Sequence, residues 1–403
     1  MNLPLAPWRR GAYTTARDYH EQGCQPAGSV IPAHRALRIA FIADWCLPRF
    51  GGLELQLFDL AHALRARGHR VRIITSTPGP ADLDGIPVHR LNGRRFPLWG
   101  FSASRQQFRE LDAVMGEHAF DVLHIHSGII APLAYGAARI AAQSGIPTAF
   151  TFHSVYDYMR PALHLLSGIG NAARMPIAWS AVSTVVSREA AQALRRPSVD
   201  VLPNGIDPAS WSVSSRLRVP GEFRLVSVGR LQVRKRPAAL FGILDHAQQL
   251  SGHTVRVTLD IVGDGPERAR VDRLALRAGA DRVRVHGRLG RADIRALFGQ
   301  SDAFLLPSRM ESFGIAALEA RCAGLPVIAR TNTGVADFIT HGQSGLLAHS
   351  DRGFAHAVAD LASDDALYSK IAEYNRANIP PYSWDEVVAL TLAQYDRAAA
   401  LHT

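Results

Sequence analysis

The chain has 403 residues, of which 47% are hydrophobic and 20% charged, and it carries a formal net charge of +10. This length is too great for one ordinary hydrophobic core and predicts two domains of a soluble globular enzyme. No charge-free run of about 20 apolar residues is present, and residues 1–10 lack a long apolar stretch, so neither a spanning helix nor a signal peptide is expected. The three widely spaced cysteines, Cys24, Cys46 and Cys322, predict no disulfide framework or zinc site, and the expected location is cytoplasmic.

Residues 1–36 are expected to form an irregular extension, because Gly, Pro and Thr are scattered there without a sustained period. A strand at 38–43 precedes a helix whose apolar residues recur at helical spacing up to Gly68. Further strands are predicted near 71–75, 121–126, 147–153, 181–187 and 199–202, which completes a first domain over residues 37–205.

The second half of the chain repeats this alternation of strands and helices. Strands are predicted near 223–229, 256–262, 282–286, 302–306 and 326–329, within a second domain over residues 206–380. Alternation of this kind indicates two parallel sheets with helices on both faces. A last helix is predicted within 381–403, after Ser383 and Trp384.

Two acidic residues, Glu311 and Glu319, are separated by eight positions, the first in a predicted loop and the second on the helix that follows. Ser312 is the predicted N-cap of this helix and Gly324 its C-terminal stop. Eight helical residues span about 12 Å, too far for the two carboxylates to share a proton or a metal ion. They are placed to hold opposite ends of an elongated ligand, with helix amides between them that attract an anion. Two solvated acids on a surface helix are the simpler interpretation of the pair taken alone.

Two cations follow the apolar run 225–228. Arg230 comes directly after Gly229 at the predicted end of a buried strand, and Lys235 lies five residues further on. The carboxyl ends of parallel strands are where open α/β sheets bind their ligands. A guanidinium and an ammonium there suit a diphosphate that gains charge as its bond to a sugar breaks. The alternative is a basic loop in a basic protein.

These elements together resemble the retaining glycosyltransferases of family 4, over about residues 37–400. The resemblance rests on motifs in both halves, namely Pro48–Glu54, Asp121–His126, Thr151–His153, Leu202–Asp207, Gly229–Leu231 with Lys235, Val262–Pro266, His286–Arg288, Leu306–Gly314, Glu319 and Gly342–Leu347. It departs at Thr333–Asp337, where the family usually has Gly-Gly-x-x-Glu. The resemblance implies an α/β protein with the GT-B fold, in which two Rossmann-like, doubly wound parallel-sheet domains face a cleft and the last helix crosses back to the first domain.

The resemblance also implies a function. It implies transfer of a hexose-type sugar from a UDP- or GDP-sugar to a hydroxyl acceptor, by front-face attack without cofactor or metal. The acceptor is lipid-linked or a small soluble molecule, and the nearest members act on phosphatidylinositol or inositol phosphate. Its site residues are Arg230, Lys235, Ser312, Phe313 and Gly314 for the diphosphate, Glu319 for the ribose, Glu311 for sugar hydroxyls, and Gly287 and Arg288 for the base. A GT-B sugar-nucleotide epimerase is the alternative enzyme.

In the first half, Gly51 and Gly52 precede a predicted helix, so their backbone can approach the diphosphate closely. A simple strand-to-helix turn is the other interpretation. His153 ends a predicted strand and, by the resemblance, hydrogen-bonds the donor sugar or the departing oxygen; otherwise it is structural. His124 and His126 alternate on a strand and point the same way, but the sequence shows no third ligand, so a metal site is not expected.

The positive charge allows a rival interpretation as a nucleic-acid-binding protein. The arginines are dispersed, however, and no nucleic-acid-binding motif is present. The local exception is the segment with Arg94, Arg95, Phe96 and Trp99, in which cations stand beside aromatic rings. This pattern is typical of contact with an anionic membrane surface and predicts a peripheral position on the inner face of the membrane. A loop folded on its own domain is the alternative.

Overall fold

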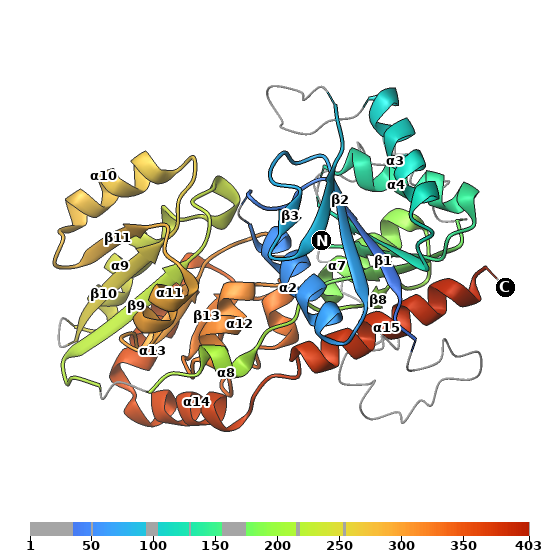
Figure 1. Cartoon of the computed structure of the whole chain (residues 1–403). Coiled ribbons are helices and arrows are strands. Elements are labelled where there is room, and N and C mark those ends of the chain that lie inside the picture. The colour runs from blue at the N-terminus through green and yellow to red at the C-terminus, as the bar shows by residue number, and fades with distance from the viewer. Residues whose placement is uncertain are drawn as a thin grey trace, which may run out of the picture.

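The computed structural model describes residues 35–49, 51–93, 104–128, 130–154, 175–214, 218–252 and 255–402. The chain forms two α/β domains, each built around one sheet (Figure 1). The predicted extension lies almost entirely outside the described residues. The segment that contains Arg94, Arg95, Phe96 and Trp99 lies outside them as well.

The first domain contains a sheet with the strand order β3-β4-β2-β1-β5-β6-β7-β8. Its strands are β1 (Arg38–Ala43), β2 (Arg70–Thr75), β3 (Asp82–Leu83), β4 (Ile86–Arg90), β5 (Val122–Ser127), β6 (Thr148–Phe152), β7 (Ile177–Ala181) and β8 (Asp200–Val201). All neighbouring strands pair in parallel except β3 and β4, which form a hairpin. Its helices are α2 (Gly52–Ala66), α3 (Arg105–Glu117), α4 (Pro132–Ser144) and α7 (Thr184–Leu194).

The sequence prediction for this sheet contains one error and one omission. The predicted strand at 181–187 is wrong, because the Ser183 hydroxyl accepts a hydrogen bond from the Val186 amide and caps the start of α7. The β-branched run in the first turn of α7 had suggested a strand. The β3–β4 hairpin was missed because its first strand has two residues. Its turn uses Asp84 and Gly85, both with positive φ, as hairpin turns of this kind require.

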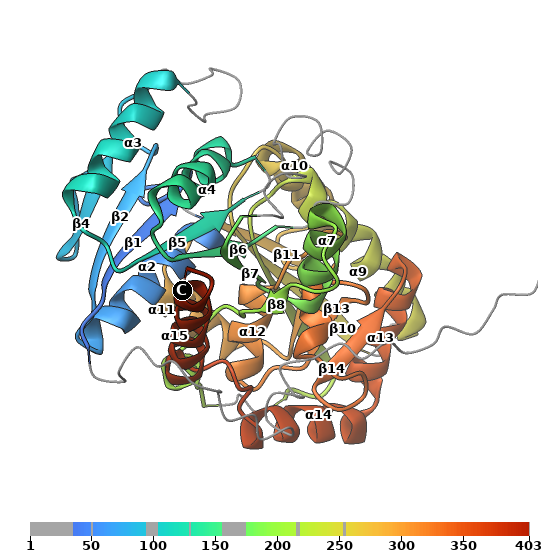
Figure 2. The same ribbon diagram turned by 90° about the vertical axis from the view of Figure 1, so that its right-hand side faces the viewer.

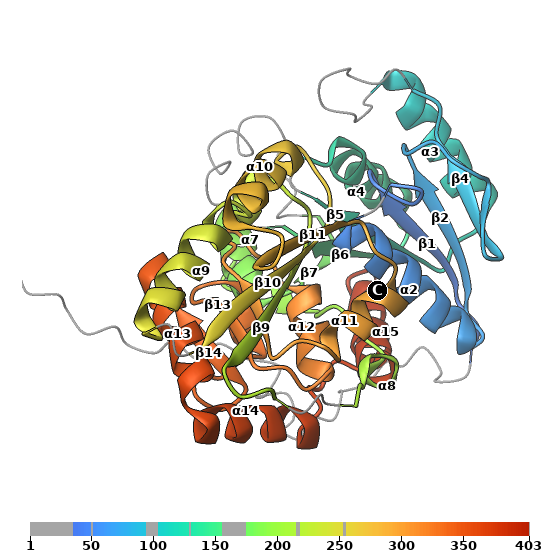
Figure 3. The ribbon, with the colours of Figure 1, turned by 90° about the vertical axis from the view of Figure 1, so that its left-hand side faces the viewer.

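The second domain contains a parallel sheet with the strand order β11-β10-β9-β12-β13-β14. Its strands are β9 (Glu222–Val228), β10 (Arg256–Val262), β11 (Val283–Gly287), β12 (Ala303–Leu306), β13 (Val327–Arg330) and β14 (Gly345–Ala348). Its α-helices are α8 (Pro208–Trp211), α9 (Ala239–Leu250), α10 (Arg268–Ala278), α11 (Arg291–Phe298), α12 (Ile315–Cys322), α13 (Asp351–Ser363) and α14 (Asp365–Ala377), and its 3₁₀ helices are η2 (Val233–Lys235) and η3 (Gly334–Asp337). Helices α9, α10 and α13 share one hydrophobic core with this sheet (Figure 3).

The last helix, α15 (Trp384–Ala400), lies against the first domain. It begins with a capping box formed by Ser383 and Glu386, and it contacts α2, β5, β6 and β7. Val387, Val388 and Tyr395 are buried in the core that α2 shares with the first sheet. Helices α2 and α15 cover one face of the sheet, and α3 and α4 cover the other (Figure 2).

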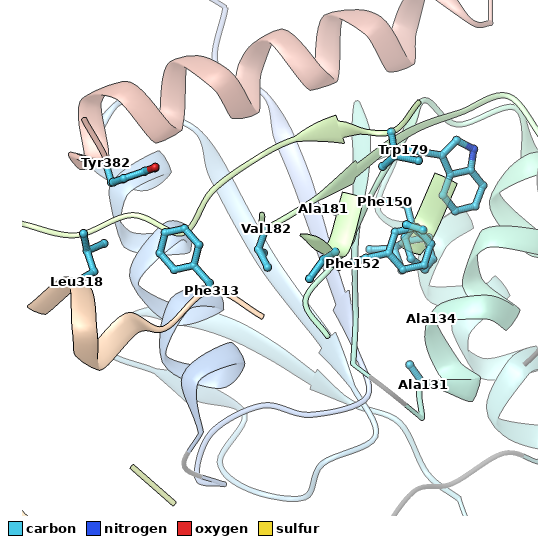
Figure 4. Close-up of a cluster of buried hydrophobic side chains, with 14 of the residues drawn as sticks. Ala131, Ala134, Phe150, Phe152, Trp179, Ala181, Val182, Phe313, Leu318 and Tyr382 are labelled. Atoms are coloured by element: carbon cyan, nitrogen blue, oxygen red, sulfur yellow. The ribbon is translucent and has the colours of Figure 1, made fainter. Parts of the chain in front are cut away.

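Below the cleft, the two domains share buried apolar side chains. Phe313 and Leu318 from the second domain lie in one hydrophobic cluster with Ala181 and Val182 at the end of β7 (Figure 4). The ring of Tyr382, just before α15, lies edge-on to Phe313 with centroids 5.6 Å apart. The crossover segment therefore supports the loop that carries Glu311 from behind.

Candidate functional site

A cleft of about 1550 Å³ lies between the domains and takes its walls from both. The predicted site residues that line it are Gly51, Gly52, His153, Arg230, Lys235, Arg288, Glu311, Ser312, Phe313, Gly314 and Glu319. Gly287 does not line it. This glycine ends β11 directly before Arg288, and its carbonyl accepts a hydrogen bond of 2.7 Å from the amide of Gly263.

The N-termini of two helices line the cleft, that of α2 from the first domain and that of α12 from the second. The two helices lie near one another in Figure 1. They approach closely, since a Cβ atom on Gly52 would lie 3.1 Å from Cδ1 of Ile315. The first turns of both helices therefore border the same space, where their amides attract an anion. In α2 the amide of Glu54 already donates to the carboxylate of the same residue. The prediction that Ser312 caps α12 is wrong. Gly314, with φ of 96°, is the N-cap, because its left-handed conformation delays the start of the helix by two residues.

Glu311 and Lys235 form an ion pair at the cleft wall, with 2.5 Å between Oε2 and Nζ. Glu311 is only 8% exposed, so the lysine compensates a buried carboxylate. The Glu311 carbonyl accepts a hydrogen bond of 2.9 Å from the amide of Gly334. A Cβ on Gly334 would lie 1.9 Å from the Ser312 carbonyl oxygen, so only glycine permits this packing.

The segment Thr333–Asp337, which differs from the usual family motif, ends in Asp337. The structure places Asp337 at the domain interface. Its carboxylate accepts a hydrogen bond of 2.7 Å from the amide of Thr184 and another from the hydroxyl of that residue. Asp337 thus caps the first turn of α7 in the other domain, where a negative charge is favourable. Burial raises the pKa of its carboxyl, and the bonds to Thr184 oppose this change.

Arg230 follows β9 and lies in the cleft without a side-chain hydrogen bond to any described residue. The loop that carries it is held by a hydrogen bond of 3.0 Å from the Leu231 amide to the Asp264 carbonyl. A Cβ on Gly263 would lie 1.9 Å from the Gly229 carbonyl oxygen, which explains the glycine in this turn. Arg230 is therefore a cation on a rigid loop whose donors remain available to a ligand.

Sequence reasoning missed two charged residues on the first-domain wall, Arg49 and Glu54. The Arg49 guanidinium lies 3.6 Å from the centroid of the Trp45 ring, and its Nε lies 3.4 Å from Oε1 of Glu54. Glu54 occupies the first turn of α2, 5% exposed, and burial raises the pKa of its carboxyl. The sequence did contain a signal for Glu54, because this acidic residue directly follows Gly51-Gly52-Leu53 at the start of the predicted helix. No chemical role was attached to it because its burial beside arginines depends on tertiary contacts.

Glu319 lies half-buried in the cleft wall on α12. Burial raises the pKa of its carboxyl to about 8, with nearby Arg291 lowering it and Asp59 raising it. Neither Arg291 nor Asp59 was predicted to be at the site, because each is an ordinary exposed-helix charge in sequence. Both line the cleft.

Three histidines are packed together on β5 and just after the carboxyl end of β6. His126 Nδ1 lies 3.0 Å from His153 Nε2, and the rings of His124 and His126 stack with centroids 4.0 Å apart. Both ring nitrogens of His124 are engaged, one by Tyr395 and the other by Thr151. Burial lowers the pKa of His124 and of His153 to about 3. Across the described residues, no group of three or more His, Cys, Asp or Glu side chains is placed to hold a metal ion.

Comparison with known families gives matches in both halves of the chain. The model for Glycosyltransferase Family 4 matches residues 50–210, and that for Glycosyl transferases group 1 matches residues 214–378. A GDP-mannose-dependent alpha-mannosyltransferase of Mycobacterium tuberculosis is 28% identical over 91% of this chain and 98% of its own. A D-inositol 3-phosphate glycosyltransferase of Xylanimonas cellulosilytica is 26% identical, again over 91% of this chain and 98% of its own.

Among solved structures, Anabaena HepE in complex with UDP and glucose is similar, with a TM-score of 0.67 and 20% identity over 89% of this chain and 99% of its own. This likeness supports the GT-B fold. No helix in the described part of the chain is both long and apolar enough to span a bilayer. The matches in both halves, the paired parallel sheets and the cleft between them agree, and the chain therefore belongs to glycosyltransferase family 4, with the GT-B fold.

Proposed function

We propose that this protein is a retaining glycosyltransferase that moves a hexose-type sugar from a UDP- or GDP-sugar to a hydroxyl group without a metal ion. The observation that carries the proposal is the meeting of two helix N-termini beside Arg230 and Lys235 in one cleft. Amide dipoles and cations from two domains suit a diphosphate, which is the leaving group of such a donor. Relatives support this donor class, since one is by name GDP-mannose-dependent.

The donor is proposed to lie mainly on the second domain. Arg230, Lys235 and the amides near Gly314 hold the diphosphate, and the Glu319 carboxyl accepts from the ribose hydroxyls. Glu311, which pairs with Lys235, is proposed to hold hydroxyls of the sugar. The Phe313 ring is 2% exposed and lies in the core, so its contribution to the ligand is its backbone. The base is proposed to face the backbone of Arg288, which lines the cleft directly after Gly287.

Retention is proposed to follow from attack on the face that the diphosphate leaves. The bond between the sugar and the β-phosphate oxygen breaks, and the acceptor oxygen bonds to the same carbon from the same side. The acceptor proton passes to the departing phosphate oxygen, so no carboxylate base is required. Negative charge grows on the diphosphate in this step, and Arg230, Lys235 and the two helix termini stabilise it.

The acceptor is proposed to approach from the first domain, whose cleft wall combines Trp45 and Ile130 with the charged pair Arg49 and Glu54. The proposed acceptor is a hydroxyl compound that is either linked to a lipid or small and soluble. The contact of Arg94, Arg95, Phe96 and Trp99 with a membrane stays a prediction. It is tested by co-sedimentation with vesicles that contain anionic lipid, where binding is expected at low salt and release at high salt.

The function is tested by incubating the protein with UDP-, GDP- and ADP-sugars and following melting temperature and slow donor hydrolysis. One UDP- or GDP-sugar is expected to raise the melting temperature and to be hydrolysed at an unchanged rate in EDTA. NMR of the released or transferred sugar is expected to show the anomeric configuration of the donor. An inverted product would exclude retention, and loss of activity in EDTA would exclude a metal-free reaction. A donor that changes its sugar without any acceptor would instead indicate an epimerase.

A further inference from the structure

The three histidines form a connected group that reaches from the core to the cleft. His124 and His126 lie on β5, 0% and 2% exposed, and His153 follows β6 and lines the cleft. The ring nitrogen His153 Nε2 is occupied by His126, at 3.0 Å from its Nδ1. The nitrogen that remains for a ligand is Nδ1 of His153. Whether it carries a proton decides whether His153 donates or accepts in the cleft.

The position of the proton on His124 follows from a chain of hydrogen bonds that ends at the carbonyl oxygen of Phe150. Ser180 lies 3.3 Å from the carbonyl oxygen of Phe150, and since a carbonyl only accepts, the Ser180 hydroxyl donates to it. Thr151 then donates to Ser180 over 2.8 Å and accepts from Nε2–H of His124 over 2.8 Å. His124 Nδ1 in turn accepts from the Tyr395 hydroxyl over 3.0 Å. His124 is therefore neutral, with its proton on Nε2.

The proton between His126 and His153 has two possible positions. If His153 Nε2–H donates to His126 Nδ1, then His126 carries its own proton on Nε2, a buried atom with no partner among the described residues. A buried N–H without an acceptor costs about 1–3 kcal/mol. If His126 Nδ1–H donates instead, the unpaired Nε2 is only an unused acceptor, which proteins tolerate more readily. The second arrangement is favoured.

We propose that His126 is a positioning residue that holds the His153 proton on Nδ1, so that His153 faces the cleft as a hydrogen-bond donor and not as a base. This inference rests on the proposed function for its chemical meaning. A donor at this place meets an oxygen lone pair of the bound sugar nucleotide, either on a sugar hydroxyl or on the departing phosphate oxygen. An unprotonated Nδ1 could only accept, so it would repel the phosphate oxygen and could bind a sugar hydroxyl only if that hydroxyl donated. His153 would then keep its donor throughout the neutral range, because burial holds its pKa far below 7.

The tautomer is tested directly in the full-length protein labelled with ¹⁵N in its histidine rings. The His153 signals are assigned by their loss in His153→Gln, and long-range ¹H–¹⁵N spectra then show which ring nitrogen is protonated. The expected result is a proton on Nδ1 of His153. A proton on Nε2 overturns the proposal; it would mean that a water in the adjoining cavity of about 20 Å³ satisfies a protonated Nε2 of His126. This measurement needs no substrate, so it stands even if the proposed function fails.

The role of His126 in turnover is tested with two substitutions. The amide nitrogen of Asn lies near the position of His Nδ1, so His126→Asn keeps a donor toward His153, whereas His126→Leu has none. We expect His126→Leu to lower kcat for donor hydrolysis about 10- to 100-fold, the range for one misdirected hydrogen bond. His126→Asn is expected to restore most of it, and neither change should alter the Kd of free UDP or GDP.

Two comparisons separate positioning from a loss of folding. Tyr395→Phe removes a hydroxyl from the same buried group without touching His153, so it is expected to lower the melting temperature and leave kcat unchanged. In a His153→Gln background, His126→Leu is expected to cause no further loss of kcat. Equal loss in His126→Asn and His126→Leu, or additive losses in the double variant, would overturn the positioning role. Absence of turnover in the wild type with every nucleotide sugar would count against the proposed function instead.

Discussion

Asp59 on α2 binds the guanidinium of Arg291 at the start of α11, so an ion pair joins the two domains across the cleft. One of its two contacts, between Nη1 and Oδ1, measures 3.3 Å. Glu319 lies close enough to both charges for each to affect the pKa of its carboxyl. Contact between the domains and the charge of the proposed ribose site are therefore linked.

Asp59→Asn is expected to remove this link. Arg291 is 53% exposed at its side chain, so the pair is screened by solvent and the loss in unfolding free energy should stay below about 1 kcal/mol. Small-angle scattering is expected to show a larger mean radius of gyration without nucleotide, because one contact across the cleft is gone. Asp272→Asn, which breaks an exposed pair with Arg268 within α10, is the matched control. If both variants scatter like the wild type, the pair does not hold the domains together.

Nucleotide binding is expected to depend on pH through Glu319. The pKa of its carboxyl is raised from 4.5 to about 8 without ligand, and ribose hydroxyls donate best to the ionised form. Binding then releases a proton, and affinity for UDP or GDP rises as the pH increases from about 5 toward 8. Calorimetry in two buffers with different ionisation enthalpies measures this release. Glu319→Gln should bind more weakly and without the pH dependence, whereas proton uptake by the wild type would contradict the assignment.

The raised pKa of Glu319 also affects stability: nucleotide affinity is expected to rise with pH, whereas the unfolding free energy is expected to fall. Because the folded-state pKa of Glu319 lies above its ordinary value of 4.5, the folded protein holds this proton more tightly than the unfolded chain. The contribution to unfolding free energy is fully present below about pH 4.5 and is lost as the pH rises through about 8. Denaturant titrations of wild type and Glu319→Gln should therefore diverge as the pH rises from 5 to 8, with Glu319→Gln the more stable at high pH.

The two cations should differ in their effect on stability although both serve the diphosphate. Arg230→Ala and Lys235→Ala should each lower turnover about 100-fold, the loss expected for one preorganised electrostatic donor. Lys235→Ala should also lower the unfolding free energy by up to about 3 kcal/mol, because it leaves the buried Glu311 carboxylate unpaired. Adding Glu311→Gln should recover that stability but not the activity. Normal turnover in both single variants would exclude the proposed binding of the diphosphate by Arg230 and Lys235.

Close approach of the helix termini can be tested at Gly52. Gly52→Ala places a Cβ 3.1 Å from Cδ1 of Ile315, so it should narrow the space between α2 and α12 and lower donor turnover. Stability should hardly fall, because Ala is favoured over Gly in a helix by up to about 1 kcal/mol. Gly242→Ala in α9, where the new Cβ meets no atom within 4 Å, is the control for helix propensity alone. Equal turnover in the two variants would show that the donor does not occupy the space between the N-termini of α2 and α12.

Local pattern was sufficient for most of the fold. Strands such as the one predicted near 256–262 are confirmed by the structure, and the predicted last helix is present, with Ser383 as its N-cap. The prediction failed where local and tertiary preferences conflict. Ser183 caps a helix whose first turn is a run of β-branched residues, and the helix after Glu311 is capped by Gly314 and not by Ser312.

The sequence by itself determined the two parallel sheets, the helices between them and the family, because periodicity and motif spacing are properties of neighbouring residues. It also placed Arg230, Lys235, Glu311 and Glu319 on segments that the structure brings to one cleft. Only the tertiary structure decided the charge partners. The Lys235 contact to Glu311, the Asp59 contact to Arg291 and the Asp337 cap on α7 join segments 76, 232 and 153 positions apart. No local pattern encodes such pairs, because their energies depend on burial and distance in three dimensions.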